Sequence, residues 1–115
     1  MNDVTMRAIE YALDGLNLRS EVIANNVANA EVPGFTASHV SFERHLASAM
    51  ERGSFDSAPG PAVIRKADIF NGVNEVSLED EMVEMIRTGL LRDAMVSAYN
   101  FKANQLRNAM KGVMA

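Results

Sequence analysis

The first thirty residues carry two rows of apolar positions at helical spacing. The longer row alternates steps of three and four residues and contains Met6, Ile9, Leu13, Leu16, Ser20, Ile23, Val27 and Ala30. At about 100° per residue a second row lies roughly 140° further round the helix, and it contains Val4, Ala8, Tyr11, Gly15, Leu18 and Val22. An ordinary surface helix has one apolar stripe, so two stripes predict a helix that packs against neighbours on two sides.

The last third of the chain predicts a second, longer helix. Ser77 with Asp80 three residues later has the spacing of a capping box, and the acidic residues that follow give way to basic ones, which suits the helix dipole. The main row contains Leu78, Met82, Met85, Gly89, Arg92, Val96, Tyr99, Ala103, Leu106, Met110 and Val113, and a weaker row contains Val83, Ile86, Leu90, Ala94 and Phe101. A helix over 78–113 would be roughly 54 Å long, whereas a small domain spans about 30 Å. We therefore expect this helix to pack against helices of other chains.

The three prolines, at positions 33, 59 and 61, all lie between these two segments. Because proline breaks helix interiors, we divide the chain into an N-terminal helix over 1–32, an irregular middle over 33–75 and a C-terminal helix over 76–115, together one structural domain. The expected fold is mainly α: two long helices paired as a coiled coil, an irregular or small-β middle, and an elongated subunit of a helical assembly.

Within the middle, three short stretches have local signatures. Val32-Pro33-Gly34-Phe35 has the composition of a tight turn, with proline second and glycine third. Residues 53–61 read as a flexible linker, and 62–74, which contain Asn71-Gly72, favour a small hairpin.

Composition narrows the class of protein. The 115 residues are 23% charged and 48% apolar, have a net charge of −4 and include no cysteine. These values argue against a nucleic-acid-binding protein, a disulfide scaffold and a thiolate zinc site. No apolar run approaches the ~18 residues of a membrane span, and the acidic start is unlike a cleavable signal, so cytosolic residence is expected unless a signal-independent export route exists.

Candidate chemistry is sparse. One candidate metal-binding cluster is present, made of His39, Glu43 and His45. Its spacing fits neither one helix face nor a standard zinc motif, so we favour solvated histidines as the interpretation. The acidic residues from Glu75 to Glu84 are better explained as a helix start than as catalytic carboxylates. We therefore expect no enzyme, no catalytic residue, no cofactor and no metal, and neither nucleic acid nor a small-molecule substrate as a partner.

Asn25, Asn26 and Asn29 are poor helix formers close to the expected turn. Two interpretations stay open from the residues alone. The asparagines either mark a fraying helix end or make polar contacts that fix one register against a neighbour.

The segment Ala24-Asn25-Asn26-Val27-Ala28-Asn29-Ala30-Glu31-Val32-Pro33-Gly34-Phe35 resembles the amino-terminal signature of bacterial flagellar rod and hook proteins. That family usually has Ala-Asn-Asn-x-Ala-Asn-x-x-Thr-Pro-Gly followed by Phe or Tyr, and this chain departs from the pattern at Val32. The residues that match are Ala24, Asn25, Asn26, Ala28, Asn29, Pro33, Gly34 and Phe35.

The segment from Asn71 to Met82 is similar to the Asp-Gly-Asn-x-Val-x-Leu-Glu-x-Glu-Met stretch of one short proximal rod protein of this family. Asn71 stands in place of the usual aspartate. Glu81-Met82-Val83-Glu84-Met85 partly resembles the Glu-Met-Val-Asp stretch of its sibling short rod protein, which stays as an alternative. Hook and distal-rod proteins are much longer than 115 residues.

The resemblance implies a structural subunit of the proximal rod, part of the drive shaft that carries torque from the membrane ring to the distal rod and hook and is required for motility. Its implied partners are other rod proteins, copies of itself, the rod–ring adaptor, the membrane ring and the flagellar type III export apparatus. It implies a location in the basal-body rod across the periplasm, reached without a cleaved signal peptide. Subunits of the family pair their terminal helices and stack around the export channel, which would use two apolar rows per helix, one within the subunit and one between subunits.

The helix-packing residues expected from these rows are Ile9, Leu13, Leu16, Ile23 and Val27 in the first helix and Leu78, Met82, Met85, Val96, Tyr99, Leu106 and Met110 in the last. Within one subunit we expect the first set to meet Met82, Met85, Val96, Tyr99 and Leu106. A function of a different class, a cytosolic helical adaptor or chaperone that oligomerises, is equally compatible with helices that carry two rows.

Overall fold

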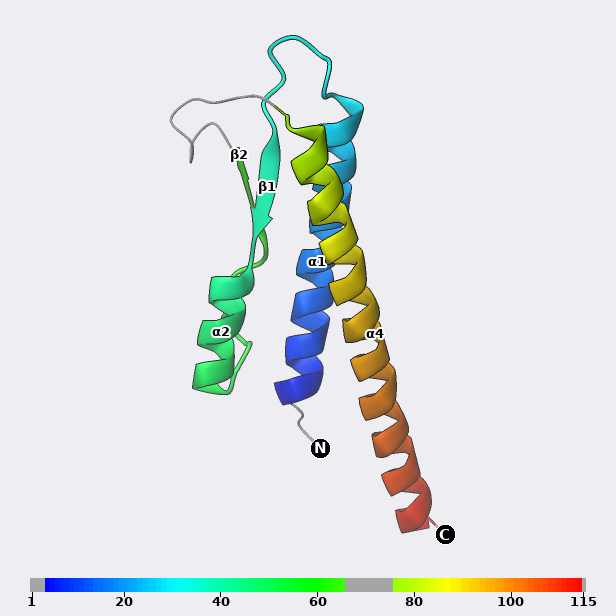
Figure 1. Cartoon of the computed structure of the whole chain (residues 1–115). Helices are drawn as coiled ribbons and strands as arrows, with labels where there is room; N and C mark the ends of the chain where they lie inside the picture. Colours follow the sequence, from blue (N-terminus) through cyan, green and yellow to red (C-terminus); the bar gives the residue numbers. More distant parts are fainter. Residues whose placement is uncertain (1–3, 66–75, 115) are drawn as a thin grey trace.

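The computed structural model describes residues 4–65 and 76–114 of the chain. Its elements, in chain order, are α1 (Val4–Ala28), β1 (Ser38–Ser41), α2 (Glu43–Arg52), β2 (Ala62–Arg65) and α4 (Leu78–Met114). The molecule measures 64 × 26 × 15 Å, and α1 and α4 lie side by side in opposite directions, with the β1–β2 pair and α2 beside α1 (Figure 1). The predicted mainly helical, elongated fold with a small β element in the middle is confirmed.

Helix α4 begins where the sequence predicts. The hydroxyl oxygen of Ser77 accepts the backbone N–H of Asp80 at 3.3 Å, so this part of the capping box is present. The 37 residues of α4 correspond to roughly 55 Å of helix, whereas the 25 residues of α1 correspond to roughly 38 Å. The C-terminal turns of α4 therefore continue past the start of α1 (Figure 1).

Helix α1 ends at Ala28, four residues before the boundary that we expected at position 32. The N–H of Asn29 still donates to the carbonyl oxygen of Asn25, but the N–H of Ala30 turns to Val27 and that of Val32 to Asn29. The last two of these hydrogen bonds span three residues where the α-helix spans four, so the α-helix ends before Pro33.

Helix α2 corrects the expectation that the middle of the chain is irregular. The prolines exclude a helix only at and around positions 33, 59 and 61, and the stretch between them is free to be helical. Glu43 lies in the first turn and Arg52 in the last, which suits the helix dipole. Gly53 then takes the left-handed conformation (φ 69°), and the N–H groups of Gly53 and Ser54 donate to Met50 and Ala49 in the Schellman arrangement that ends many helices.

The two strands also differ in detail from the prediction. A hairpin within 62–74 was expected, but β2 pairs antiparallel with β1, with Ser38 opposite Arg65 and Ser41 opposite Ala62. The Asn71-Gly72 pair lies outside the described residues. The connection between the strands contains α2, so local turn chemistry does not set this pairing.

Residues 53–61 are not the free linker that their composition suggests. Phe55 is buried, and its ring lies 5.5 Å from the ring of Tyr11 in α1. The hydroxyl of Tyr11 also donates to the carbonyl oxygen of Pro59. One aromatic side chain of α1 therefore fastens this segment to the helix.

The buried core lies between α1 and the middle of the chain, in two clusters. The first contains Ala12, Leu16, Val40 and Phe42, with Tyr11, Leu18, Val22, Leu46 and Met95 packed against it. The second contains Ala8, Ala49 and Phe55, with Val4, Tyr11, Leu46 and Ala58 packed against it. In the described ranges, none of the helices carries an apolar stretch long enough to cross a bilayer.

Candidate assembly surface

Both apolar rows of α1 are covered by the chain itself. Ile9, Leu16 and Ile23 of the longer row are buried, Leu13 and Val27 are half-buried, and α1 packs more extensively against α4 than against any other element. The second row is covered by the chain's own middle segment. Its members pack in the two clusters that contain Val40, Phe42, Ala49 and Phe55, and they are Val4, Ala8, Tyr11, Leu18 and Val22.

Asn26 decides between the two interpretations of the asparagines. Its side chain is 1% exposed, its Nδ2 donates to the carbonyl oxygen of Ser38 at 2.7 Å, and its Oδ1 accepts the N–H of Ser38 at 3.0 Å. This two-bond contact fixes the register of β1 against α1 within one chain. Asn29 has a different part, because its Nδ2 donates to the carbonyl oxygen of Asn25 at the helix end.

The rest of the family-like segment forms the turn that follows α1. The N–H of Phe35 donates to the carbonyl oxygen of Val32 at 3.2 Å, and Gly34 has φ of 79°, so the predicted turn is confirmed with glycine where a positive φ is needed. Pro33 and Gly34 are exposed and Phe35 is half-buried. Ala24, Asn25 and Ala28 are exposed on α1.

Arg19 fastens the junction between β1 and α2 to α1. Its Nη2 donates to the carbonyl oxygen of Val40 and to Oε1 of Glu43, both at 2.7 Å, and its guanidinium carbon lies 4.7 Å from the ring centre of Phe42. Partial burial raises the pKa of the Glu43 carboxyl, but the hydrogen bond and charge of Arg19, together with backbone N–H bonds, outweigh burial and lower that pKa below its ordinary value. No motif or spacing in the sequence indicates this contact.

The face of α4 that packs on the chain is not the predicted apolar row. Glu81 and Thr88 are each 1% exposed, and Met95 packs against the first core cluster. These residues are seven apart, so they lie in one row along α4. Its small and polar members carry no hydrophobic signal, which is why the sequence did not find this seam.

The predicted row of α4 lies mostly at the surface. Met82, Met85 and Val96 are 59%, 44% and 42% exposed, so the structure leaves much of each side chain uncovered, whereas we expected them to pack against α1. Tyr99 and Leu106 are half-buried. The large apolar residues exposed on α4 are Leu78, Met82, Val83, Met85, Ile86, Leu90, Leu91, Val96, Phe101, Met110 and Val113. They occupy most of the circumference that α1 leaves uncovered.

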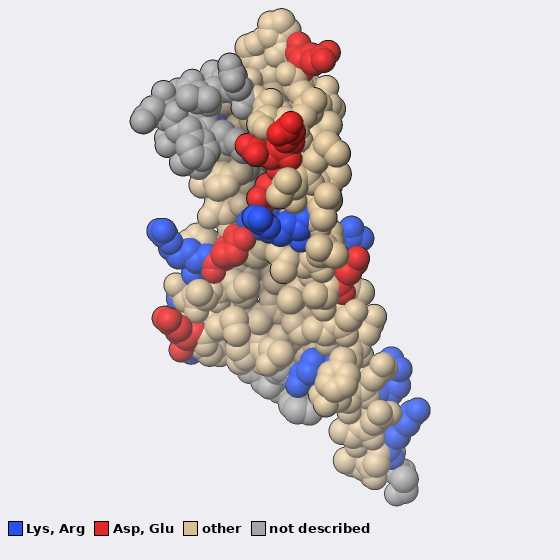
Figure 2. All heavy atoms as spheres, viewed as in Figure 1, with Lys and Arg blue, Asp and Glu red and all other residues tan. Residues whose placement is uncertain are grey.

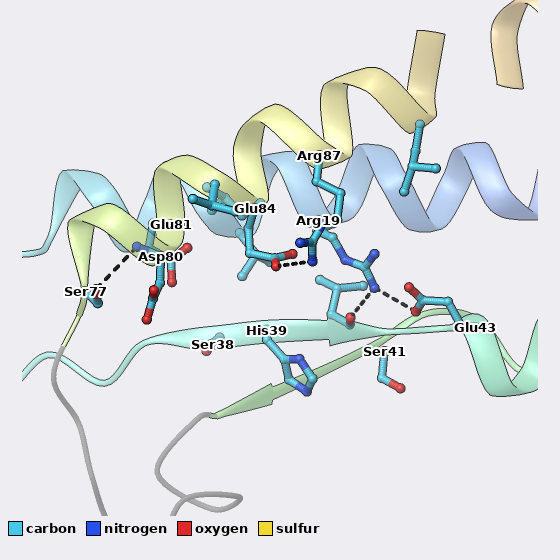
Figure 3. A pocket seen from close by; sticks show the side chains of 15 residues that line it. Arg19, Ser38, His39, Ser41, Glu43, Ser77, Asp80, Glu81, Glu84 and Arg87 are labelled. Carbon is cyan, nitrogen blue, oxygen red and sulfur yellow. Dashed lines mark hydrogen bonds and ion pairs between the residues drawn. The ribbon is translucent and has the colours of Figure 1, made fainter. Parts of the chain in front are cut away.

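A groove of about 680 Å³ runs between the start of α4 and β1, with α1 as its floor (Figure 3). Glu84 and Arg87 pair across one turn of α4 at 3.0 Å on one wall, and the Arg19–Glu43 contact lies at the opposite wall. Val22, Ile23 and Leu91 supply apolar lining. Two of the carboxylates that line the groove are paired with arginines, Asp80 is exposed and Glu81 is buried.

The candidate metal cluster does not assemble. Within residues 4–65 and 76–114, no three histidine or acidic side chains lie together as a metal would need. His39 is on β1, whereas Glu43 and His45 belong to α2, and Glu43 is engaged with Arg19.

An elongated helical subunit with a small complete core and one long helix still covered with exposed apolar residues is a protein built to be packed among other helices. That combination defines the class as a structural assembly subunit.

Known proteins agree with this class. The family described as flagella basal body rod protein matches residues 9–36. The flagellar basal body rod protein FlgB of Aeromonas hydrophila is 30% identical over 90% of this chain and 89% of its own length. FlgB of Bacillus subtilis (strain 168) is 27% identical over 94% of both chains, and FlgB of Borrelia hermsii is 28% identical over 79% of this chain and 85% of its own.

The chain belongs to the FlgB family of flagellar basal body rod proteins. It is a structural, non-enzymatic component of the proximal rod, and its location is the flagellar basal body. Membership implies assembly with rod components. The relatives support this short rod protein over the sibling that the sequence left open.

Proposed function

We propose that this subunit packs through α4 against copies of itself and other rod proteins, and that the rod so formed carries torque from the membrane ring toward the distal rod and hook. The rod–ring adaptor and the membrane ring are the further partners. The flagellar type III export apparatus delivers the chain without a cleaved signal, and the chain takes its place in the rod across the periplasm.

One observation carries this proposal: α4 exposes large apolar side chains along most of its length while α1 does not. Burial of one such side chain is worth roughly 1.5–3 kcal/mol, so a helix bearing this many is strongly favoured to pack among other helices. Long helices packed laterally spread a twisting load over a large interface, which is what a drive shaft needs.

The packing residues divide between two kinds of contact in this proposal. Contacts within the subunit use Ile9, Leu13, Leu16, Ile23 and Val27 with Tyr99 and Leu106. Contacts between subunits use Leu78, Met82, Met85, Val96 and Met110. The family motif from Ala24 to Phe35 shapes the end of α1 and the turn, and the three segments 1–32, 33–75 and 76–115 act as one domain, which is supported by the packing of Phe42 and Phe55 on α1.

Detergent extraction of basal bodies from the source cells, followed by mass spectrometry, tests this proposal. We expect the chain to co-purify with the rod and the membrane ring, and to be lost from the same preparation made from cells that lack the rod. Absence from intact basal bodies, with recovery as a stable oligomer in the cytosol, would refute the rod proposal and favour an adaptor or chaperone.

A further inference from the structure

Methionine carries all of the sulfur in this chain, which has eight methionines and no cysteine. Of the methionines whose side chains the structure describes, those that are exposed, at 55%, 59%, 44% and 63%, are Met50, Met82, Met85 and Met110. An oxidant of the peroxide class acts on thiolates and on thioethers, and it reaches exposed ones first. In this protein the exposed thioethers are therefore its first targets.

Two of these thioethers form a pair on α4. Met82 and Met85 are three residues apart, so their side chains are neighbours on the helix surface, and exposed Leu78 lies one turn before Met82. Most of the molecular surface drawn in Figure 2 carries neither acidic nor basic groups. The proposed function assigns Met82 and Met85 to contacts between subunits. Such contacts depend on apolar side chains that lose water when neighbouring helices cover them.

Reaction with hydrogen peroxide removes the apolar character of a methionine. A lone pair of the thioether sulfur attacks one oxygen of the peroxide, so that a sulfur–oxygen bond forms and the oxygen–oxygen bond breaks. The other oxygen leaves as hydroxide, which takes the proton from the transferred oxygen and becomes water. Sulfur is oxidised and the peroxide is reduced. The product is a sulfoxide, a polar group that costs free energy when it is buried without a hydrogen-bond partner.

We propose that Met82 and Met85 are a peroxide-sensitive modification site of the unassembled subunit, and that their sulfoxides prevent α4 from packing into the rod. This inference rests on the proposed function, because it needs neighbouring subunits to bury this part of α4. Met50 lies on α2, outside the row, so its sulfoxide leaves assembly unchanged. Met95 packs against the first core cluster, so it reacts slowly while the chain is folded.

Peroxide treatment of the purified full chain tests the reactivity. Samples taken at intervals are digested, and mass spectrometry measures the gain of one oxygen atom at each methionine. We expect Met82 and Met85 to react severalfold faster than Met95 and about as fast as Met50. In urea the difference should disappear, because unfolding exposes every thioether. A folded chain in which Met95 reacts as fast as Met82 would overturn the proposal.

Substitution tests the consequence for assembly. Met82→Gln with Met85→Gln replaces each thioether by an unbranched polar side chain of similar length, whereas Met82→Leu with Met85→Leu keeps the site apolar without sulfur. Each variant replaces the natural chain in cells, and its amount in isolated basal bodies is measured. We expect the glutamine pair to lower that amount roughly tenfold or more, because two polar groups buried without partners cost more than the ~1.4 kcal/mol that corresponds to tenfold. The leucine pair and Met50→Gln should leave it near the natural amount.

A comparison within the natural chain needs no variant. In cells grown with peroxide, the sulfoxide content of Met82 and Met85 should be severalfold lower in chains from basal bodies than in unassembled chains. Equal contents in the two pools would overturn the inference. Urea unfolding checks that the glutamine pair still folds, and we expect its midpoint to match the natural one because both replaced side chains are exposed.

The outcomes separate this site from the function on which it rests. A glutamine pair present in basal bodies at the natural amount, or lowered no further than by Met50→Gln, would overturn the modification site and leave the rod assignment intact. Absence of the unsubstituted chain from basal bodies would overturn the rod assignment and the inference with it.

Discussion

Replacement of Gly15 by alanine should destabilise the subunit, although alanine is the better helix former. A Cβ atom at position 15 would lie 2.5 Å from Cγ and 2.7 Å from Cε1 of Phe42, and closer still to Cδ1, whereas carbon atoms in contact are about 3.5–4.0 Å apart. The ring would have to retreat by roughly 1 Å. It is 2% exposed, with Tyr11 at its edge and the Arg19 guanidinium over its face, so it has little room to do so.

The magnitude follows from two opposing terms. Alanine in place of a helical glycine gains roughly 1 kcal/mol, and overpacking of a filled core costs roughly 1–3 kcal/mol. Because movement of Phe42 also disturbs Arg19 and the start of α2, we expect the upper part of that range and a net loss of about 2 kcal/mol in the free energy of unfolding. Gly89→Ala is the matched control, since in the described part of the chain no atom beyond its chain neighbours and the local helix backbone lies within 4 Å of its Cβ position, and it should stabilise by roughly 0.5–1 kcal/mol.

Urea unfolding of the purified chain, followed by far-ultraviolet circular dichroism, measures both variants against the natural protein. Phe42→Leu in the Gly15→Ala background supplies a further check, because a smaller side chain should relieve the clash and make the two changes less than additive. If Gly15→Ala were as stabilising as Gly89→Ala, the close packing of Phe42 on α1 would be refuted.

Two further predictions concern the polar contacts of α1. Asn26→Ala leaves the backbone N–H and carbonyl of Ser38 without their side-chain partner and should lower the free energy of unfolding by roughly 1–3 kcal/mol, whereas exposed Asn25→Ala should change it by less than about 0.5 kcal/mol in the same urea assay. The lowered pKa of Glu43 means that its pairing with Arg19 stabilises the folded chain above the ordinary carboxyl pKa and is lost as pH falls through the lowered value, so stability should decrease on acidification below about pH 4.5. Glu43→Gln should flatten that part of the pH profile, and an unchanged slope would show that the pairing does not contribute.

Features with a local cause were predictable from the sequence. The cap at Ser77, the turn at Pro33-Gly34 and the length of α4 follow from propensities of neighbouring residues, and all three are present. The dipole-matched ends and terminal glycine of α2 are equally local signals, and the prolines on either side exclude a helix only close to themselves. The Asn26–Ser38 and Arg19–Val40 contacts join residues 12 and 21 apart, and nothing in a single sequence specifies such pairs.

Periodicity shows that a helix has a neighbour on a given side, but it does not show which neighbour. Both stripes of α1 are faces that the chain itself covers, and β1, α2 and the segment around Phe55 pack on the second. For α4 the sequence predicted burial within the subunit for a row that is mostly exposed. Its strongest apolar row is left bare by the chain, while the row that packs inward includes Glu81 and Thr88.

One physical reason explains both the cover of the second α1 stripe and the exposure of the main α4 row. The side of α4 that α1 covers is narrow, and small or hydrogen-bonded residues suffice to fill it, whereas the wider uncovered side carries the larger apolar side chains, whose burial would release the most free energy. In a subunit that folds and then polymerises, the most hydrophobic row is therefore the one buried last, when subunits assemble. On this argument the stripes of α1 describe how the subunit folds, and the rows of α4 describe how the rod is built.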